Sequence, residues 1–176
     1  MKAVCFRGPA GVGKTTLAYE VGRDIVKKTL MSNKLGYISA DMFAHISFDC
    51  RYTDNEIDFK YDLIHQIVGR LAKQGYTVIY DDTFQRYKDY VAMIDCLSSN
   101  GYNVHLFSLT APLEVVLSRN KARFWKERIS NARVKMLHAI HTEHSRADET
   151  AINTLLTVEH NSSLILKEVY GVNLTL

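Results

Sequence analysis

Eight consecutive residues near the start of the chain have the types and spacing of a phosphate-binding loop. They read Gly8-Pro9-Ala10-Gly11-Val12-Gly13-Lys14-Thr15 and fit the P-loop, or Walker A, pattern G-x-x-x-x-G-K-[ST]. The glycines let the backbone wrap closely around a phosphate and turn its N–H groups inward. The residues predicted to bind the nucleotide are Gly8, Pro9, Ala10, Gly11, Val12, Gly13, Lys14, Thr15 and Thr16.

The last two residues of this motif have separate expected tasks. Lys14 would hold the β- and γ-phosphates with its positive charge, and the Thr15 hydroxyl is suited to bind Mg²⁺. The helix expected to begin near Lys14 adds the positive end of its dipole at the same place. The expected ligands of the motif are therefore ATP and Mg²⁺.

The segments on both sides of the loop have the patterns that it requires. Residues 2–6 are short, apolar and β-prone, and Leu17, Val21 and Ile25 recur four residues apart, which puts them on one face of a helix. A glycine turn that fits the motif by chance is disfavoured, because the strand and the helix both stand where the motif needs them.

An acidic residue follows the second predicted strand, residues 36–40. In open sheets of parallel strands, ligands bind at the carboxyl ends of the strands, which is also the edge where a P-loop lies. Asp41 is therefore expected to accept or orient the proton of an acceptor hydroxyl beside the γ-phosphate. The alternative is that Asp41 only caps the next short helix.

Two more acids end the third predicted strand, residues 77–80. A carboxylate at this point can hold Mg²⁺, often through a water molecule, as a Walker B acid does. The register leaves Asp81 or Asp82 for this role, and we favour Asp81. Asp82 would then contact the acceptor or cap the following helix.

Positive charge is concentrated between residues 119 and 135. This segment carries +6, while the whole chain carries +3. Such a field suits a polyanion, although a solvated basic helix face would also explain it. Arg119 and Arg123 share a face if the preceding helix continues, and two guanidinium groups there would clamp the transferring phosphoryl group opposite Lys14. We therefore predict a lid over 119–135, and the predicted catalytic residues are Lys14, Asp41, Arg119 and Arg123.

The residue type and position of two further groups leave open what binds the adenine and bear on a possible metal site. Phe124 and Trp125 would pack the lid or lie near the adenine, and residues 154–161 are a second candidate for the adenine-binding edge. His138, His141 and His144 stand three residues apart, which turns them away from one another on a helix, so a metal site is disfavoured.

Strand-like and helix-like segments alternate along the rest of the chain. Further helices are expected over 56–74, 87–100 and 131–144, and a fourth strand over 104–109. This alternation predicts an α/β fold with a parallel sheet of about five strands and helices on both faces. With its P-loop and a short basic lid, the chain resembles the three-layer P-loop NTPase sandwich of the nucleoside-kinase type. Residues 1–176 are expected to form a single domain.

The composition is that of a globular protein without a membrane span. The chain is 47% hydrophobic and 23% charged, and no apolar run approaches the length of about 18 residues that a span needs. The first strand begins so early that it leaves no room for a signal peptide. Three scattered cysteines do not suggest a disulfide framework, so we expect a reducing, cytoplasmic location.

Taken together, these motifs resemble one group of P-loop kinases. The P-loop, the acid after the second strand, Val-Ile-Tyr-Asp-Asp-Thr at 78–83 and Ala-Pro-Leu-Glu-Val-Val-Leu-Ser-Arg-Asn-Lys-Ala-Arg at 111–123 are similar to the group that includes polynucleotide 5′-hydroxyl kinases and zeta-toxin-like small-molecule kinases. The resemblance covers about the first 125 residues and implies transfer of the γ-phosphate of ATP to an alcohol. It implies roles for Asp41 as general base, Lys14 on the phosphates, Thr15 on Mg²⁺, and Arg119 and Arg123 in the lid.

Two departures from the pattern of this group affect the acceptor side. Polynucleotide kinases of the group usually carry an arginine three residues after the strand-two acid, to hold the acceptor's 3′-phosphate, but Ala44 stands there. The strand-three motif usually continues Thr-Asn, and here it is Thr83-Phe84. The basic residues that could replace the missing arginine are His45, Arg51 and Arg86.

The preferred hypothesis is an ATP-dependent kinase of a hydroxyl acceptor, best matched by the 5′-hydroxyl of a polynucleotide or a nucleotide-like alcohol. A small-molecule or nucleoside monophosphate kinase is the alternative, for which Arg51, Arg70 and Arg86 are available. A P-loop NTPase switch without phosphotransfer is the third, although the chain lacks an Asn-Lys-x-Asp-type guanine motif. The oligomeric state is left open.

Overall fold

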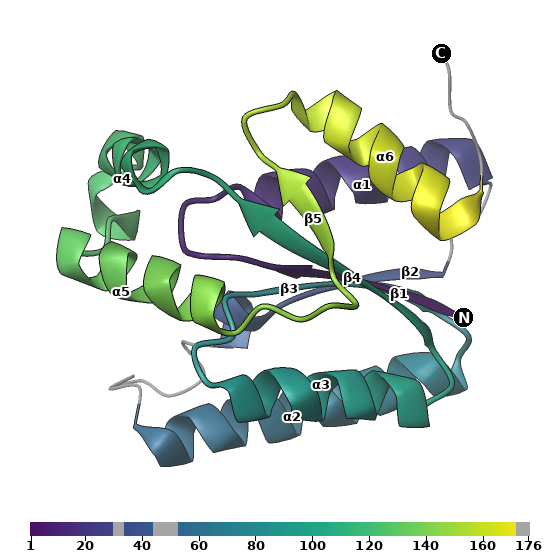
Figure 1. Ribbon diagram of the computed structural model, residues 1–176. Coiled ribbons are helices and arrows are strands. Elements are labelled where there is room, and N and C mark those ends of the chain that lie inside the picture. Colours follow the sequence, from purple (N-terminus) through teal and green to yellow (C-terminus); the bar gives the residue numbers. More distant parts are fainter. Residues whose placement is uncertain (30–33, 44–52, 172–176) are drawn as a thin grey trace.

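The computed structural model describes residues 1–29, 34–43 and 53–171 (Figure 1). The expectations for Ala44, His45, Cys50 and Arg51 fall outside these residues. Along the chain the elements are β1 (Lys2–Arg7), α1 (Lys14–Thr29), β2 (Leu35–Ser39), the 3₁₀ helix η1 (Ala40–Phe43), α2 (Asp54–Lys73), β3 (Thr77–Asp82), α3 (Tyr87–Ser99), β4 (Asn103–Thr110), α4 (Leu113–Ala122), the 3₁₀ helix η2 (Trp125–Glu127), α5 (Asn131–Glu143), β5 (Thr150–Asn153) and α6 (Val158–Tyr170).

The strands form one parallel sheet in the order β2-β3-β1-β4-β5. Helices α1 and α6 cover one face of this sheet and α2 and α3 cover the other, while α4 and α5 lie beyond the carboxyl ends of the strands (Figure 1). This arrangement confirms the predicted three-layer α/β fold with a five-stranded parallel sheet.

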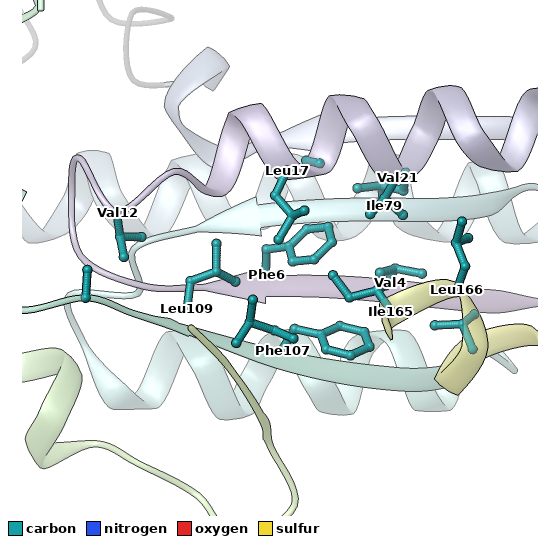
Figure 2. Packing of buried hydrophobic residues seen from close by; sticks show 14 of the residues in the cluster. Val4, Phe6, Val12, Leu17, Val21, Ile79, Phe107, Leu109, Ile165 and Leu166 are labelled. Atoms are coloured by element: carbon teal, nitrogen blue, oxygen red, sulfur yellow. The ribbon is translucent and has the colours of Figure 1, made fainter. Parts of the chain in front are cut away.

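The central strand β1 shows why two helical layers form. Its side chains point alternately to the two faces of the sheet. Val4 and Phe6 are fully buried on the face covered by α1 and α6, next to Ile165 (Figure 2). Ala3 and Cys5 belong to the core on the opposite face. A strand buried on both faces needs a continuous apolar sequence, which residues 3–6 provide.

Two helix boundaries differ from the predicted ones for identifiable reasons. α2 begins at residue 54 instead of 56, because Thr53 and Glu56 form a capping box in which the Glu56 carboxylate accepts from the Thr53 N–H at 2.9 Å. α4 ends at Ala122, and Arg123 is extended, with φ −64° and ψ 158°. The lid is therefore not a simple continuation of α4.

The described residues show no helix that is both long and apolar enough to cross a membrane. Cys5 and Cys96 are free thiols. Burial raises the pKa of Cys5 to about 12, which keeps this thiol protonated.

A buried ion pair involves Arg7, the residue that directly precedes the P-loop. Arg7, the last residue of β1, donates from Nε to the Glu149 carboxylate at 2.7 Å, and the Tyr90 hydroxyl donates to the same carboxylate at 2.5 Å. The side chains of Arg7 and Glu149 are only 2% and 3% exposed. Because an unpaired charge would be costly at this depth, the pair fixes the segment between α5 and β5 against the start of the P-loop.

The three histidines of α5 and its C-cap contact three different places, as their spacing predicts. His138 Nε2 lies 3.0 Å from the carbonyl oxygen of Ala111, and His141 Nε2 lies 3.2 Å from the Ser108 hydroxyl. The ring of His144 packs against Tyr87. Within the described ranges, no group of three or more His, Cys, Asp or Glu side chains could hold a metal ion.

The buried His141 should make folding stability depend on pH. Burial, followed by the nearby charge of Arg7, lowers the pKa of His141 to about 3, whereas in an unfolded chain this pKa is about 6.5. Between these values the unfolded state binds more protons, so the free energy of unfolding should fall as the pH drops below about 6.5. From pH 7 to pH 5 this residue should remove about 2 kcal/mol.

Urea unfolding of the wild type and of His141→Gln at these two pH values measures the effect. The glutamine variant should lose less stability on acidification than the wild type, because glutamine does not titrate. Equal losses in the two proteins would show that His141 is not the residue responsible.

Candidate functional site

The P-loop joins β1 to α1 at the carboxyl edge of the sheet, and its glycines meet two different requirements. Gly11 and Gly13 have φ angles of 87° and 111°, in the left-handed region that other residues rarely adopt. Gly8 is needed for space, because an added Cβ would lie 2.8 Å from Cγ1 of Val12. The backbone path of the loop thus requires glycine at each of these positions.

The Lys14 side chain folds back on the loop and is buried. Its ammonium donates to the carbonyl oxygens of Gly8 and Pro9, at 2.9 and 3.2 Å, and to the Thr83 hydroxyl at 3.3 Å. Burial lowers the pKa of Lys14, and nearby carboxylates, Asp81 first among them, act in the opposite direction. These contacts hold the Lys14 ammonium between the P-loop and the residue that follows β3.

A cleft of about 380 Å³ opens beside the P-loop. It is lined by residues 10–17 from the P-loop and α1, by Asp41, by Thr83 after β3, by Arg119 and Arg123, and by Thr154, Leu156, Val158 and Asn161 after β5. The cleft therefore brings together the four predicted catalytic residues and part of the predicted 154–161 edge. Gly8, Pro9 and Asp81 are not among the described residues that line it.

Asp41 lies where this cleft meets a second, smaller cavity. It is an exposed residue of η1, directly after β2. A cavity of about 40 Å³ on its other side is lined by Asp41 and Thr83 together with Lys60, Gln85 and Arg86, among others. Because η1 begins at Ala40, Asp41 stands inside this short helix and not at its cap position.

Asp82 holds the turn that follows β3. Its carboxylate accepts hydrogen bonds from the hydroxyls of Tyr61 and Tyr80, at 2.6 and 3.0 Å. It also accepts from the backbone N–H groups of Thr83 and Phe84, at 2.6 and 3.2 Å. Phe84 has a left-handed φ of 49°, which these bonds help to stabilise.

Asp81 points to the opposite face of the sheet, toward α1. It accepts from the Tyr37 hydroxyl at 2.6 Å and from the Ser39 hydroxyl at 2.9 Å, and it is 2% exposed. Burial raises the pKa of Asp81, while the hydrogen bond from Tyr37 and the charge of Lys14 lower it. Of the two acids at the end of β3, Asp81 is thus the one beside the P-loop.

The oxygen atoms at this place suit a magnesium ion. The Thr15 side chain is exposed in the cleft, and the buried carboxylate of Asp81 at the end of β3 accepts from the Tyr37 hydroxyl at 2.6 Å. Magnesium prefers oxygen ligands, keeps several of its waters and needs only one or two protein carboxylates. This donor set fits the ion that accompanies a nucleotide.

The two predicted lid arginines make different contacts. Arg119 donates to the Val12 carbonyl at 3.0 Å and to the hydroxyl and carbonyl of Thr154, at 2.9 and 2.7 Å. It ties the P-loop to the segment after β5. Arg123 is exposed and donates to the Glu127 carbonyl at 3.4 Å, within the lid. Because α4 ends between them, the two arginines do not share one helical face.

The expected availability of Arg86 for an acceptor phosphate is wrong. Its guanidinium forms ion pairs with Asp54, Asp58 and Asp89, at 3.0, 2.6 and 2.6 Å. A phosphate would have to displace these carboxylates. Arg70 lies in the last turn of α2, at the far end of that helix from the small cavity.

The two aromatic residues of the lid lie on its surface. Phe124 and Trp125 are 61% and 65% exposed, and their ring centroids are 5.8 Å apart. The ammonium of Lys126 lies 5.2 Å from the Trp125 ring centroid. Neither ring is among the described residues that line the cleft, so the 154–161 segment is the nearer candidate for the adenine edge.

The sequence reasoning missed Tyr37, Ser39 and the Thr83 contact with Lys14. Tyr37 and Ser39 alternate along β2 and so face the same side of the sheet. Ser39 pairs in register with Asp81 of β3. The pattern would have identified the pair only if the neighbour of β2 in the sheet had been known, since β2 and β3 are far apart in the sequence.

Comparison with known families gives one match that covers most of the chain. A family model described as "AAA domain" matches residues 4–147. No curated protein sequence matches the chain.

Solved structures share the fold at low sequence identity. A sugar kinase from Janibacter sp. HTCC2649 is 17% identical over 100% of this chain and 99% of its own, with a TM-score of 0.71. The APS kinase CysC of Mycobacterium tuberculosis is 14% identical over 94% and 95%, with a TM-score of 0.68. A chain of the Pnkp1/Rnl/Hen1 RNA repair complex is 17% identical over 81% of this chain but only 44% of its own, with a TM-score of 0.67.

Proposed function

The chain belongs to the AAA domain family, and from this premise we propose that it is an ATP-dependent kinase that transfers the γ-phosphate to a hydroxyl acceptor. The observation that carries the proposal is the position of Asp41, which lines both the cleft beside the P-loop and the small cavity next to it. A carboxylate between a phosphate site and a second site has a task in a transferase. A nucleotide switch would leave it without one.

Each polar group of the cleft has a role in this reaction. Asp41 would accept or orient the proton of the acceptor hydroxyl, so that its oxygen attacks the γ-phosphorus. Lys14 and Arg123 would stabilise the negative charge that spreads over the transferring phosphoryl group. Thr15 would bind Mg²⁺ directly, with Asp81 behind it in the place of a Walker B acid. When bound, the ion neutralises phosphate charge.

We assign Arg119 to nucleotide binding and not to the transferring group. Its three hydrogen bonds hold the Val12 carbonyl and Thr154 together across the cleft. Leu156 and Val158 add apolar surface on the same side, which suits the base of ATP. This gives the cleft a nucleotide end near β5 and a transfer end near Asp41.

The finer proposal for the acceptor is the 5′-hydroxyl of a polynucleotide. The basic lid supports it, because Lys121, Arg123, Lys126 and Arg128 are all exposed. The exposed aromatic pair of the lid adds ring faces on which bases could stack. Exposed cations together with aromatic rings are typical of surfaces that bind single-stranded nucleic acid.

A small-molecule alcohol is the second candidate, and the small cavity favours it. The described part of this cavity has a volume of about 40 Å³. The arginine in it is already neutralised by three carboxylates, so it offers little to an acceptor phosphate. An uncharged alcohol carries no phosphate, so it would not need a free guanidinium group from Arg86.

We also propose that the chain works as a single domain in a reducing compartment such as the cytoplasm. One sheet contains all five described strands, from β1 to β5. The two described cysteines are unpaired.

Transfer of label from [γ-³²P]ATP tests the proposal directly. The protein is incubated with Mg²⁺ and 5′-hydroxyl oligonucleotides of several lengths, with 5′-phosphorylated oligonucleotides as the blocked control. In parallel, polyols, aminoalcohols and nucleoside monophosphates are offered. Label on the 5′-hydroxyl strands supports the polynucleotide version, and label only on a small alcohol supports the second candidate. ATP hydrolysis without transfer to any acceptor contradicts a kinase.

A further inference from the structure

Asn120, in the last turn of α4, joins the two ends of the lid loop, residues 121–128. Its side-chain amide donates to the Ile129 carbonyl at 2.8 Å, and its side-chain oxygen accepts from the Ile129 N–H at 3.3 Å. Asn120 is 4% exposed, and Ile129 packs against the hydrophobic core that α1 covers. An asparagine side chain carries both a donor and an acceptor, so it can pair with a backbone residue as a peptide group would. These two bonds close the loop at its base.

The residues inside the lid loop have little buried surface to hold them. Residues 121–128 are all exposed, so apolar packing does not fix their path. Arg128 Nε donates to the Arg123 carbonyl at 2.7 Å, and the Arg123 N–H donates to the Asn120 carbonyl at 3.3 Å. Exposed hydrogen bonds open readily, whereas breaking a shielded one leaves polar groups unpaired. The shielded bonds of Asn120 should therefore contribute most to the order of the lid loop.

We propose that Asn120 is a positioning residue that clamps the base of the lid loop and so holds the Arg123 guanidinium at the cleft. Arg123 lines the cleft, yet the one described hydrogen bond of its side chain, at 3.4 Å to the Glu127 carbonyl, is weak. Its position therefore depends on the backbone of the loop. A misplacement of about 1 Å can slow a reaction about 10²-fold. The inference rests on the proposed function in taking Arg123 as the group that stabilises the transferring phosphoryl group.

The chain has a single tryptophan, Trp125, and its place in the lid loop allows the order of the loop to be measured directly. Time-resolved fluorescence anisotropy separates local motion of this ring from tumbling of the whole protein. Asn120→Ala should increase the amplitude of the local motion about twofold, because the base of the loop is no longer closed. Asn131→Ala is the matched control and should behave like the wild type. Asn131 is exposed at the start of α5, and no hydrogen bond among the described residues involves its side chain.

The rate of phosphate transfer separates positioning from general damage to the fold. Asn120→Ala should lower the single-turnover rate by about 10- to 10²-fold, while binding of an ATP analogue stays within about twofold of the wild type. In an Arg123→Ala background, the same substitution should slow transfer by less than about twofold, because the group that it positions is gone. Arg128→Ala removes the exposed tie to the Arg123 carbonyl and should increase the motion of Trp125 by less. Because Arg128 is exposed, this variant should fold even if Asn120→Ala does not.

Three outcomes would overturn the inference: wild-type motion of Trp125 in the variants that fold, a loss of nucleotide binding equal to the loss of transfer, or a slowing by Asn120→Ala that persists without Arg123. The anisotropy is measured without ATP or acceptor, so it is independent of phosphate transfer. A wild type that transfers phosphate to no acceptor would refute the kinase. Increased motion of Trp125 in Asn120→Ala would still show that Asn120 clamps the lid loop.

Discussion

Replacing Asp41 by asparagine should lower the rate of phosphate transfer by about 10²- to 10⁴-fold, the usual contribution of a general base. Asparagine has nearly the same shape but cannot take up the acceptor proton. The side chain is exposed in η1, so the substitution should leave folding intact. Single-turnover transfer from labelled ATP measures the rate, and binding of an ATP analogue should stay within about threefold of the wild type, because Asp41 is assigned to the acceptor.

Asp62→Asn is the matched control for this variant. Asp62 is an exposed acid of α2 and is not among the residues that line either cavity. It should transfer phosphate at the wild-type rate. An Asp41→Asn protein that transfers phosphate as fast as this control would remove Asp41 from the role of base. A variant that loses ATP binding together with transfer would place Asp41 on the nucleotide side.

The fold could be predicted from the sequence because its determinants are local. Residues 3–6 are apolar without alternation, as a strand buried on both faces requires, and the P-loop begins at Gly8. Parallel strands place all their carboxyl ends at one edge of the sheet. The position of Asp41 at the cleft therefore followed from the end of β2 alone.

Two kinds of feature in the site could not be predicted. One depends on the exact register of a strand, and the other on contacts between residues that are distant in the sequence. Asp81 and Asp82 face opposite sides of β3, because a shift of one residue along a strand reverses the face. The contact of Tyr37 with Asp81 requires knowing that β2 pairs with β3. The three carboxylates on Arg86 come from α2 and α3, which no local pattern brings together.

The lid arginines were predicted to act together, and the end of α4 separates them. Their sequence spacing is that of one helical face, but the helix stops at Ala122. Arg119, still inside α4, reaches back to the P-loop, whereas Arg123 extends into the lid. Both arginines line the cleft, but only the end of the helix distinguishes their contacts.

This difference leads to the second large expected effect. Arg123→Ala should lower the rate of phosphate transfer by about 10³-fold, the lower end of the range for an arginine that stabilises a transferring phosphoryl group. ATP binding and folding stability should change little, because Arg123 is exposed and the one described hydrogen bond of its side chain, at 3.4 Å to the Glu127 carbonyl, is weak. Arg123→Lys should recover only part of the rate, since lysine keeps the charge but not the planar fork.

Arg119→Ala should instead weaken ATP binding and lower the melting temperature, because it removes three hydrogen bonds that join Val12 to Thr154. Lys121→Ala, an exposed cation between the two arginines, controls for the loss of lid charge and should change neither quantity greatly. Transfer rates, analogue binding and melting curves of the four variants decide the assignment. If Arg119→Ala slowed transfer with normal binding while Arg123→Ala did not, the roles would be exchanged. Arg119 would then stabilise the transferring phosphoryl group, and the exposed Arg123 would guide the acceptor.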